Sequence, residues 1–200
     1  MLTLNEGRKA VTYSRMIIEE HVGEKSTTLP TFEPVFHEKR GVFVTLHTFP
    51  GYDLRGCIGI PQPVMALKEA IREAAVSSTH DPRFIPLTSE ELDSIIIEIT
   101  ILTTPNHIKV DSAEDYLDEI TIGKDGLILE YFGRTGLLLP QVAVEYGWDA
   151  KKFLSHLCLK AGVAEDTWMN KDAKIYSFSG QIFSETRPHG DIEEKTIDGI

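Results

Sequence analysis

The segment 94–102 limits the possible folds of this chain more than any other stretch. It places isoleucine at positions 95, 97, 99 and 101, with Glu98 and Thr100 between them. Successive side chains of a β-strand point to opposite faces, so this alternation predicts a strand with one wholly apolar face. Such a face must be covered by a second layer, and we therefore expect a sheet that is buried on at least one side.

Further strands come in pairs that are joined by short turns rich in glycine and proline. The expected strands are 41–49, 54–60, 94–102, 120–123, 127–132, 136–139, 174–178 and 181–184. Apolar periodicity and capping residues predict helices at 3–21, 63–78, 140–146 and 149–161, and a short helix at 88–92. Because short turns connect antiparallel neighbours, we predict an α+β protein with a largely antiparallel sheet and helices packed on it.

The two halves of the chain show similar patterns. Each has a strand that ends in Pro-Gln, at Pro61-Gln62 and at Pro140-Gln141, and a helical pattern follows in both. The shared stretch is short, so either an internal repeat or a chance match can account for it. We expect one domain over 1–200, with possible halves at about 30–102 and 118–184, and a polar tail at 185–200 that is loose at its end.

Composition argues against several classes of function. The chain has 20 basic and 31 acidic residues and a net charge of −11, which makes a nucleic-acid partner unlikely, and an RNA-related role is the weakest alternative. No apolar run is long enough to cross a bilayer, and the first residues do not resemble an export signal. With only two cysteines, the sequence predicts a cytoplasmic protein with reduced thiols.

The hexapeptide 54–59, Leu-Arg-Gly-Cys-Ile-Gly, is the main candidate for a site. Regular alternation would put Arg55 and Cys57 on one face, roughly 7 Å apart. The flanking glycines, Gly56 and Gly59, would leave room for another group to approach the backbone. This arrangement predicts a pocket, but it does not identify a reaction.

The chain resembles the AMMECR-one-like domain family. The resemblance covers roughly residues 8–184 and rests on an ordered set of motifs, which are the hexapeptide 54–59, Asp-Pro-Arg-Phe at 81–84, Gly-Lys-Asp-Gly-Leu at 123–127 and Leu-Pro-Gln-Val at 139–142. It implies two related β-β-β-α-α-β halves in one sheet and occurrence in archaea, bacteria and eukaryotes. It also implies Memo-like or radical-SAM-like partner proteins. It implies no particular reaction, and His80 departs from some relatives, which puts a general role for His80 in doubt.

The candidate site residues follow from these motifs. We expect a cleft between the hexapeptide strand and the loop 79–84. Cys57 is the candidate nucleophile and Glu98 the candidate proton-transfer group. The candidate ligand-binding residues are Arg55, Gly56, Gly59, His80, Asp81 and Arg83. A nearby cation such as Arg55 would lower the pKa of the thiol and could hold a carboxylate or phosphate.

Each candidate also has a structural interpretation. Cys57 could be a small packed residue, Arg55 could pair with an acid, and Asp81 could order its own loop. The histidines and acids match no compact ligand motif, so we predict neither a metal site nor a cofactor. Two functions therefore stay open, which are an enzyme or binding protein for a small anionic molecule and a protein-interaction module without catalysis.

Overall fold

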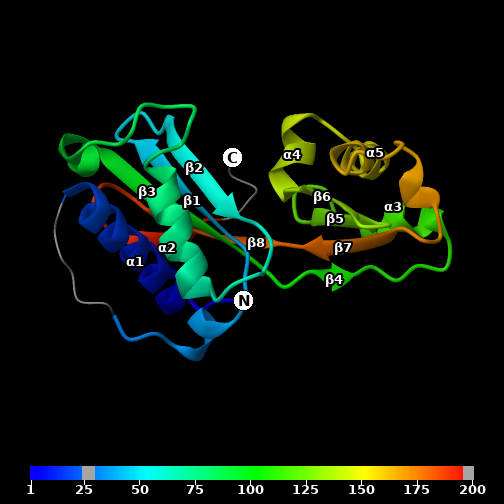
Figure 1. Cartoon of the computed structure of the whole chain (residues 1–200), viewed down its shortest axis with the longest axis horizontal. Helices are drawn as coiled ribbons and strands as arrows, with labels where there is room; N and C mark the ends of the chain where they lie inside the picture. Colours follow the sequence, from blue (N-terminus) through cyan, green and yellow to red (C-terminus); the bar gives the residue numbers. More distant parts are fainter. Residues whose placement is uncertain (24–29, 196–200) are drawn as a thin grey trace. The chain divides into compact units, whose positions relative to one another are not determined.

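The computed structural model describes residues 1–23 and 30–195. These residues form two compact units, the first made of 1–102 and 181–195 and the second of 103–180. Each unit contains an antiparallel sheet with helices packed against it (Figure 1). The predicted α+β class is thus confirmed, but the strands belong to two sheets instead of the single sheet that the resemblance implied.

The first unit has a five-stranded sheet in the order β2-β1-β3-β8-β9. Its strands are β1 (Val42–Thr48), β2 (Leu54–Ile60), β3 (Ile95–Leu102), β8 (Gly180–Glu185) and β9 (Ile192–Lys195). Its helices are α1 (Leu4–Gly23) and α2 (Leu67–Ser78), with short 3-10 turns at Pro34–His37 and Ser89–Ser94. Both helices lie on one face of this sheet (Figure 1), and we call the opposite face the outer face.

The core of the first unit follows from the alternation seen in the sequence. The fully buried residues of β1, Val42, Val44 and Leu46, pack with the isoleucines of β3 and with α1 and α2. The residues between them in each strand point to the outer face. The apolar face predicted for 94–102 is therefore the face under the helices, and Glu98 lies on the outer face.

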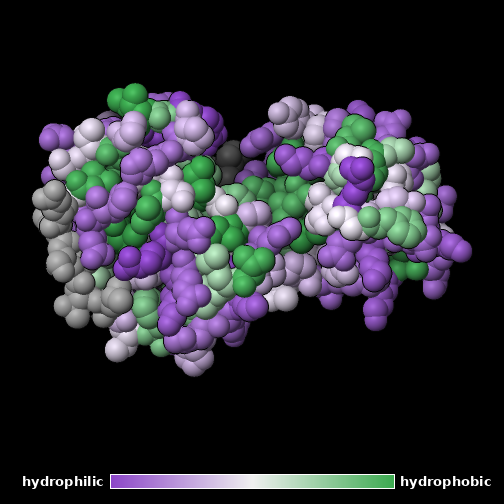
Figure 2. Space-filling view, in the orientation of Figure 1, coloured by the Kyte–Doolittle hydropathy of each residue, from purple (hydrophilic) through white to green (hydrophobic). Residues whose placement is uncertain are grey.

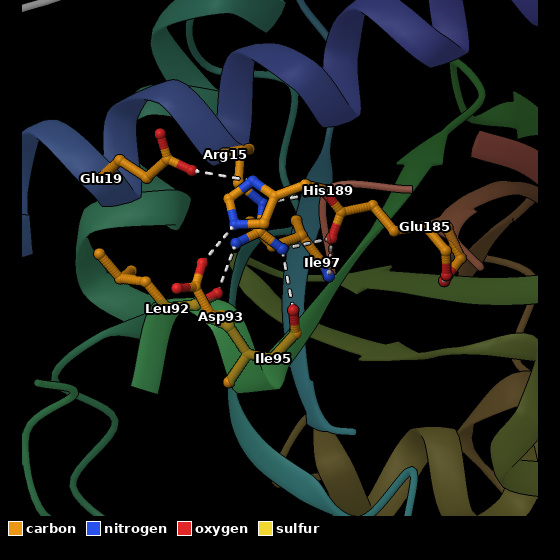
Figure 3. Close-up of polar contacts among 9 residues, drawn as sticks. Arg15, Glu19, Leu92, Asp93, Ile95, Ile97, Glu185 and His189 are labelled. Atoms are coloured by element: carbon orange, nitrogen blue, oxygen red, sulfur yellow. Dashed lines mark hydrogen bonds and ion pairs between the residues drawn. The ribbon is translucent and has the colours of Figure 1, made fainter. Parts of the chain in front are cut away.

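A buried ion pair ties α1 to the sheet. Figure 3 shows Arg15 directed at Glu185 of β8, and both side chains are almost completely buried. Arg15 also donates to the carbonyl oxygens of Leu92 and Ile95, and Glu185 accepts from the backbone N–H of Ile97 at 2.9 Å. These contacts satisfy both charges, which a buried pair requires.

The second unit has a four-stranded sheet in the order β4-β7-β5-β6. Its strands are β4 (Asn106–His107), β5 (Gly126–Tyr131), β6 (Arg134–Leu138) and β7 (Lys174–Phe178). Its helices are α3 (Tyr116–Glu119), α4 (Pro140–Glu145) and α5 (Ala150–Lys160), with 3-10 turns at Ala113–Asp115 and Thr167–Met169. Its own buried cluster includes Leu127, Leu129, Phe153 and Ile175.

Both units contain the same short topology. A hairpin is followed by helix and then by a strand that pairs with the first strand of the hairpin, which gives the orders β2-β1-β3 and β6-β5-β7. This element order differs from the β-β-β-α-α-β arrangement that the resemblance implied, because residues 120–123 form turns instead of a strand. Within the predicted polar tail, Ile192–Lys195 form a strand that pairs with β8, and the end of the tail, residues 196–200, lies outside the described residues.

Several helix ends are where the sequence predicted them. Thr88 and Glu91 form a capping box, and the carboxylate of Asp149 accepts from the backbone N–H of Lys152 at 2.8 Å. Gly162 follows α5 with a φ of 71°, a value that glycine adopts without strain. Local capping chemistry therefore sets these boundaries.

The surface is mainly polar. Hydrophilic side chains predominate on the face drawn in Figure 2, and apolar ones form scattered patches. Across the described part of the chain, no helix combines the length and the apolar character that a membrane crossing needs.

Candidate functional site

The hexapeptide strand is not regular. The pairing of β1 with β2 shifts between Leu46 and His47, so that Leu46 faces Gly56 and His47 faces Leu54. Arg55 is the extra residue of this β-bulge, which re-aims side chains on the bulged strand. The regular alternation that predicted Arg55 beside Cys57 therefore does not apply.

Arg55 has a structural partner. Its Nε and Nη2 donate to the two carboxylate oxygens of Glu91 at 2.7 and 3.0 Å, and only 9% of the residue is exposed. The hydrogen bonds from Arg55 hold the pKa of Glu91 below its usual range. Glu91 also accepts from the backbone N–H of Thr88, so this bidentate pair anchors the turn before β3. These contacts use the Nε–Nη2 edge of Arg55, and its side chain is only 10% exposed, which leaves little of the guanidinium open to the expected ligand.

Other parts of the protein occupy the space beside the two glycines of the hexapeptide. A Cβ at Gly56 would overlap the carbonyl oxygen of Ser78, at the end of α2. A Cβ at Gly59 would overlap the ring of Phe43, its partner in β1. The space that was expected to admit a ligand at these positions therefore serves close packing.

The loop after α2 lies directly against β2. Asp81 is almost completely buried, and its Oδ2 accepts from the backbone N–H of Cys57 at 2.8 Å. Arg83 donates to both oxygens of Asp81, and its Nη2 lies 3.3 Å from the carbonyl oxygen of Cys57. The Asp81–Arg83 pair thus takes the place of a neighbouring strand at Cys57. The expected cleft between this strand and loop is closed by hydrogen bonds at this point.

The two members of this pair differ in exposure. The bonds from Arg83 hold the pKa of Asp81 well below its usual range, so Asp81 carries a constant negative charge. The Arg83 side chain is 56% exposed, whereas that of Asp81 is 1% exposed. Asp81 is consequently a positioning residue, and Arg83 is the cation that a ligand can reach.

His80 belongs to a different environment. Its Nδ1 lies 2.7 Å from the hydroxyl oxygen of Thr79, and its ring contacts His21 of α1 edge-on at 5.2 Å. Both contacts are on the helix side of the loop. The structure gives His80 no contact with the hexapeptide.

Cys57 and Glu98 are brought together on the outer face. Thr45 of β1 pairs with Cys57 on one side and with Glu98 on the other. The three side chains therefore form a row across neighbouring strands, which lie about 4.8 Å apart. The hydroxyl of Thr45 donates to the Cys57 sulfur at 3.3 Å. Of the residues proposed from sequence, Asp81 and Arg83 contact Cys57 directly, Glu98 shares its row with Thr45 between them, and Arg55 and His80 are bonded elsewhere.

The thiol of Cys57 is not activated in this state. Burial raises its pKa, as do the charges of Asp81 and Glu98, and these effects outweigh the Thr45 hydrogen bond and the charge of Arg83. A protonated thiol is a weak nucleophile. The cation that lowers the thiol pKa is Arg83, and the role expected of Arg55 thus passes to Arg83.

Glu98 is the centre of a polar cluster. The hydroxyl of Tyr52 donates to its Oε2 at 2.7 Å, and Lys195 of β9 donates to the same oxygen at 3.1 Å. Its Oε1 lies 3.7 Å from Nε2 of His47. The Lys195 ammonium also bonds the Tyr52 hydroxyl and lies 4.2 Å from the centre of the Tyr52 ring. The cluster therefore combines residues from β1, the turn after it, β3 and β9.

These contacts keep Glu98 ionised. Burial alone would raise the pKa of Glu98, but the His47 and Tyr52 contacts and the charge of Lys195 lower it to about 2. A carboxylate with such a low pKa is a poor base near neutral pH. The low pKa argues against a raised pKa at Glu98, which a base near neutral pH would need, and a part in proton transfer stays a prediction for this residue.

Sequence reasoning left Thr45, Tyr52 and Lys195 out of the site. Thr45 could have been found, since its position on β1 follows from the hairpin register. Tyr52 lies in a turn and Lys195 in the predicted polar tail, and no local signal places either beside Glu98. In the described ranges, no group of three or more His, Cys, Asp or Glu side chains is placed to hold a metal ion.

Comparison with known proteins places this architecture in a family. The model of the AMMECR1 family matches residues 11–183. The chain is 54% identical to Protein MJ0810 of Methanocaldococcus jannaschii, with 98% of each chain covered, and 46% identical to Protein MK0488 of Methanopyrus kandleri, with 98% and 96% covered. The crystal structure of the uncharacterized protein PH0010 from Pyrococcus horikoshii aligns with a TM-score of 0.77 at 42% identity, over 96% of this chain and 97% of that one. The resemblance inferred from the motifs is confirmed.

Proposed function

The chain belongs to the AMMECR1 family, and we propose that its first unit binds a small anionic molecule beside Cys57 and uses the thiol as the reacting group. The observation that supports this most is the position of Arg83. An exposed guanidinium, fixed by the buried Asp81, lies next to a partly exposed thiol on the same strand edge.

The hydrogen bonds of Arg83 leave part of its fork for a ligand. Within the described residues, Nε and Nη2 bond Asp81 and Cys57, and no hydrogen bond uses Nη1. A planar guanidinium with a free N–H edge binds carboxylate or phosphate groups well. An anion held there would carry its neighbouring carbon or phosphorus atom close to the Cys57 sulfur.

The chemistry would follow from the state of the thiol. Since the pKa of Cys57 is raised by burial, the sulfur keeps its proton until a bound molecule supplies an electrophile. Attack then forms a bond from the sulfur to the electrophilic carbon, the bond from that carbon to its leaving group breaks with the electron pair going to the leaving group, and the thiol proton passes to a base. Such a site suits an acyl- or alkyl-transfer enzyme, or a protein that captures its ligand covalently.

The test compares two alkylating reagents that differ mainly in charge. Iodoacetate carries the anion that Arg83 should attract, and iodoacetamide does not. We expect Arg83→Gln to lower the iodoacetate rate at Cys57 about tenfold relative to the iodoacetamide rate, and Arg83→Lys to retain most of the preference. Peptide mass spectrometry resolves Cys57 from Cys158, which is fully buried and serves as an internal reference for unfolding.

Arg187→Gln is the matched control, because it removes an exposed arginine from the same unit. Equal reagent preference in wild-type protein and in Arg83→Gln would remove the anion-binding proposal. A slow Cys57 reaction with both reagents, no faster than Cys158, would remove the thiol chemistry.

A protein-interaction role is the second candidate, and a different feature favours it. Phe132 lies at the tip of the β5–β6 hairpin with 78% of its surface exposed and a φ of 42°. Bulky residues rarely adopt positive φ, and an exposed aromatic side chain is typical of an interface anchor. A hollow of about 380 Å³ beside it is lined by this hairpin together with Asp172 and Lys174.

Binding of a purified Memo-like protein tests this second candidate. Sedimentation of the mixture should show a complex that Phe132→Ser weakens and Cys57→Ser leaves unchanged. A complex that is insensitive to Phe132→Ser, or no complex at micromolar concentration, would argue against this surface.

A further inference from the structure

His47 is a partly buried histidine whose ring nitrogens form no hydrogen bond with the described residues. Among the described residues, neither ring nitrogen has a hydrogen-bond partner, although both are inaccessible to solvent and the side chain is 14% exposed. Buried polar groups are almost always paired, and an unpaired one calls for a specific explanation. A ring nitrogen kept free in this way is available to a ligand or to a proton.

The surroundings of His47 orient its ring. The ring stacks on Tyr52 with centroids 4.1 Å apart and an angle of 11° between planes. Its Nε2 faces Oε1 of Glu98 at 3.7 Å, a separation that a small shift converts into a hydrogen bond. With a proton on Nε2 directed at the carboxylate, the lone pair is on Nδ1. This is the arrangement in which a carboxylate selects the histidine tautomer.

His47 and Cys57 share the outer face. Cys57 pairs with Thr45, and His47 lies two residues further along β1, so the two side chains are diagonal neighbours. The Cβ atoms of diagonal neighbours are roughly 7 Å apart, a gap that one small polar group can bridge once a shift of the ring opens its nitrogen, which is closed to solvent in this structure. His80, the other histidine of the motif region, is bonded to Thr79 and contacts α1.

We propose that His47 is the proton acceptor for Cys57, and that Glu98 and Tyr52 are positioning residues which hold its ring. The proposal rests on the proposed function, because it supplies the base which that chemistry requires. The S–H bond of Cys57 breaks, its electron pair stays on sulfur, and the proton reaches Nδ1 through the bridging group. The resulting imidazolium faces the Glu98 carboxylate.

The charges around His47 come from three elements. The Glu98 carboxylate on β3 lies 3.7 Å from Nε2 of the ring, and Lys195 on β9 is paired with that carboxylate at 3.1 Å. The Tyr52 hydroxyl is neutral, since burial raises the pKa of this phenol further above its usual range.

The test is the pH profile of Cys57 alkylation by iodoacetamide, a neutral reagent that does not require Arg83. At pH 7 we expect His47→Gln to react about tenfold more slowly than wild-type protein, with Glu98→Gln in between. The rates should converge at high pH, where the thiol is deprotonated without help. Thr100→Val is the matched control, because Thr100 lies on the same face of β3, two residues beyond Glu98.

Superimposable profiles for wild-type protein and His47→Gln would overturn the proposal, whatever the outcome of the iodoacetate comparison. Conversely, an iodoacetate preference that Arg83→Gln leaves unchanged would remove only the anion site and would leave His47 as acceptor. If His47→Gln does not fold, the ¹⁵N NMR spectrum of the His47 imidazole in wild-type protein tests the proposal, because it shows which ring nitrogen carries the proton. Nδ1 without a proton at neutral pH supports the proposal, and a proton fixed on Nδ1 contradicts it.

Discussion

In each of the two sheets, paired positions on three neighbouring strands form a row of side chains. The rows that face the helices have the same residue types in both sheets, and the rows on the opposite face differ. In the first unit, the inner row runs across β2, β1 and β3, and in the second it runs across β6, β5 and β7. The inner rows are Gly56–Leu46–Ile97 and Gly136–Leu129–Ile175. At both glycines a Cβ would overlap a backbone carbonyl oxygen of the covering helix, that of Ser78 or of Leu157.

The next position along each strand gives the outer rows. These are Cys57–Thr45–Glu98 in the first unit and Leu137–Ile128–Tyr176 in the second. The inner rows match because close helix packing imposes the same requirement twice. The outer rows differ in chemistry, with a thiol, a hydroxyl and a carboxylate in one and mainly apolar groups in the other. We therefore expect function at the outer row of the first unit, where the two units differ in chemistry.

The largest effect should come from the ion pair that is buried in the first unit. Glu185→Gln leaves Arg15 charged and buried without its partner, and we expect it to destabilise the protein by roughly 4 kcal/mol. Urea unfolding followed by circular dichroism measures this change. Glu193→Gln on β9 is the control, since Glu193 is exposed. A loss below 1 kcal/mol would mean that this pair does not hold α1 to the sheet.

The second effect is a loss of stability at acid pH, which we expect from the outer row that contains Glu98 and not from the outer row of the second unit. The folded pKa of Glu98 is about 2, below its ordinary value of 4.5, so its contribution is complete above pH 4.5 and is lost as the pH falls toward 2. At about 1.4 kcal/mol for each pKa unit, this contribution is up to roughly 3 kcal/mol.

The difference in unfolding free energy between wild-type protein and Glu98→Gln should therefore shrink between pH 4.5 and 2. Tyr176→Phe, the corresponding position of the second unit, should show a difference that is independent of pH in this range. A constant difference for Glu98→Gln would contradict the ionised state assigned to this carboxylate.

The third effect tests whether the inner rows are equivalent. Gly56→Ala and Gly136→Ala should each cost about 2 kcal/mol, because the added methyl group meets backbone that cannot turn aside. Gly59→Ala should cost less, since its Cβ meets the movable ring of Phe43. Both tryptophans, Trp148 and Trp168, belong to the second unit, so their fluorescence reports Gly136→Ala directly.

The smallest effect should be that of Cys57→Ser on stability, which we expect to stay within about 1 kcal/mol because the side chain is partly exposed. Ile128→Ala, in the corresponding outer row, should cost about 2 kcal/mol, since Ile128 is 8% exposed. Denaturant midpoints of the two variants give the comparison. A large loss for Cys57→Ser would indicate a packing role for the thiol.

Much of the fold could be predicted from local patterns. The isoleucine alternation placed the inner face of β3, and the Thr88–Glu91 and Asp149 caps placed helix starts. The same alternation put Glu98 on the outer face, where it shares a row with Thr45 and Cys57. The bulge at Arg55 could not be predicted, because it arises from the pairing of β2 with β1 and leaves no local pattern.

The sequence by itself determined which segments become strands and helices, because side-chain periodicity and capping act within a few residues. It also determined that Cys57 and Arg83 would be present in motifs that mark the family. Tertiary structure alone decided that Arg55 pairs with Glu91, that Arg83 is the cation at the thiol, and that Lys195 reaches Glu98. Such partners lie far apart in the chain, and only the register of paired strands brings them within hydrogen-bond distance.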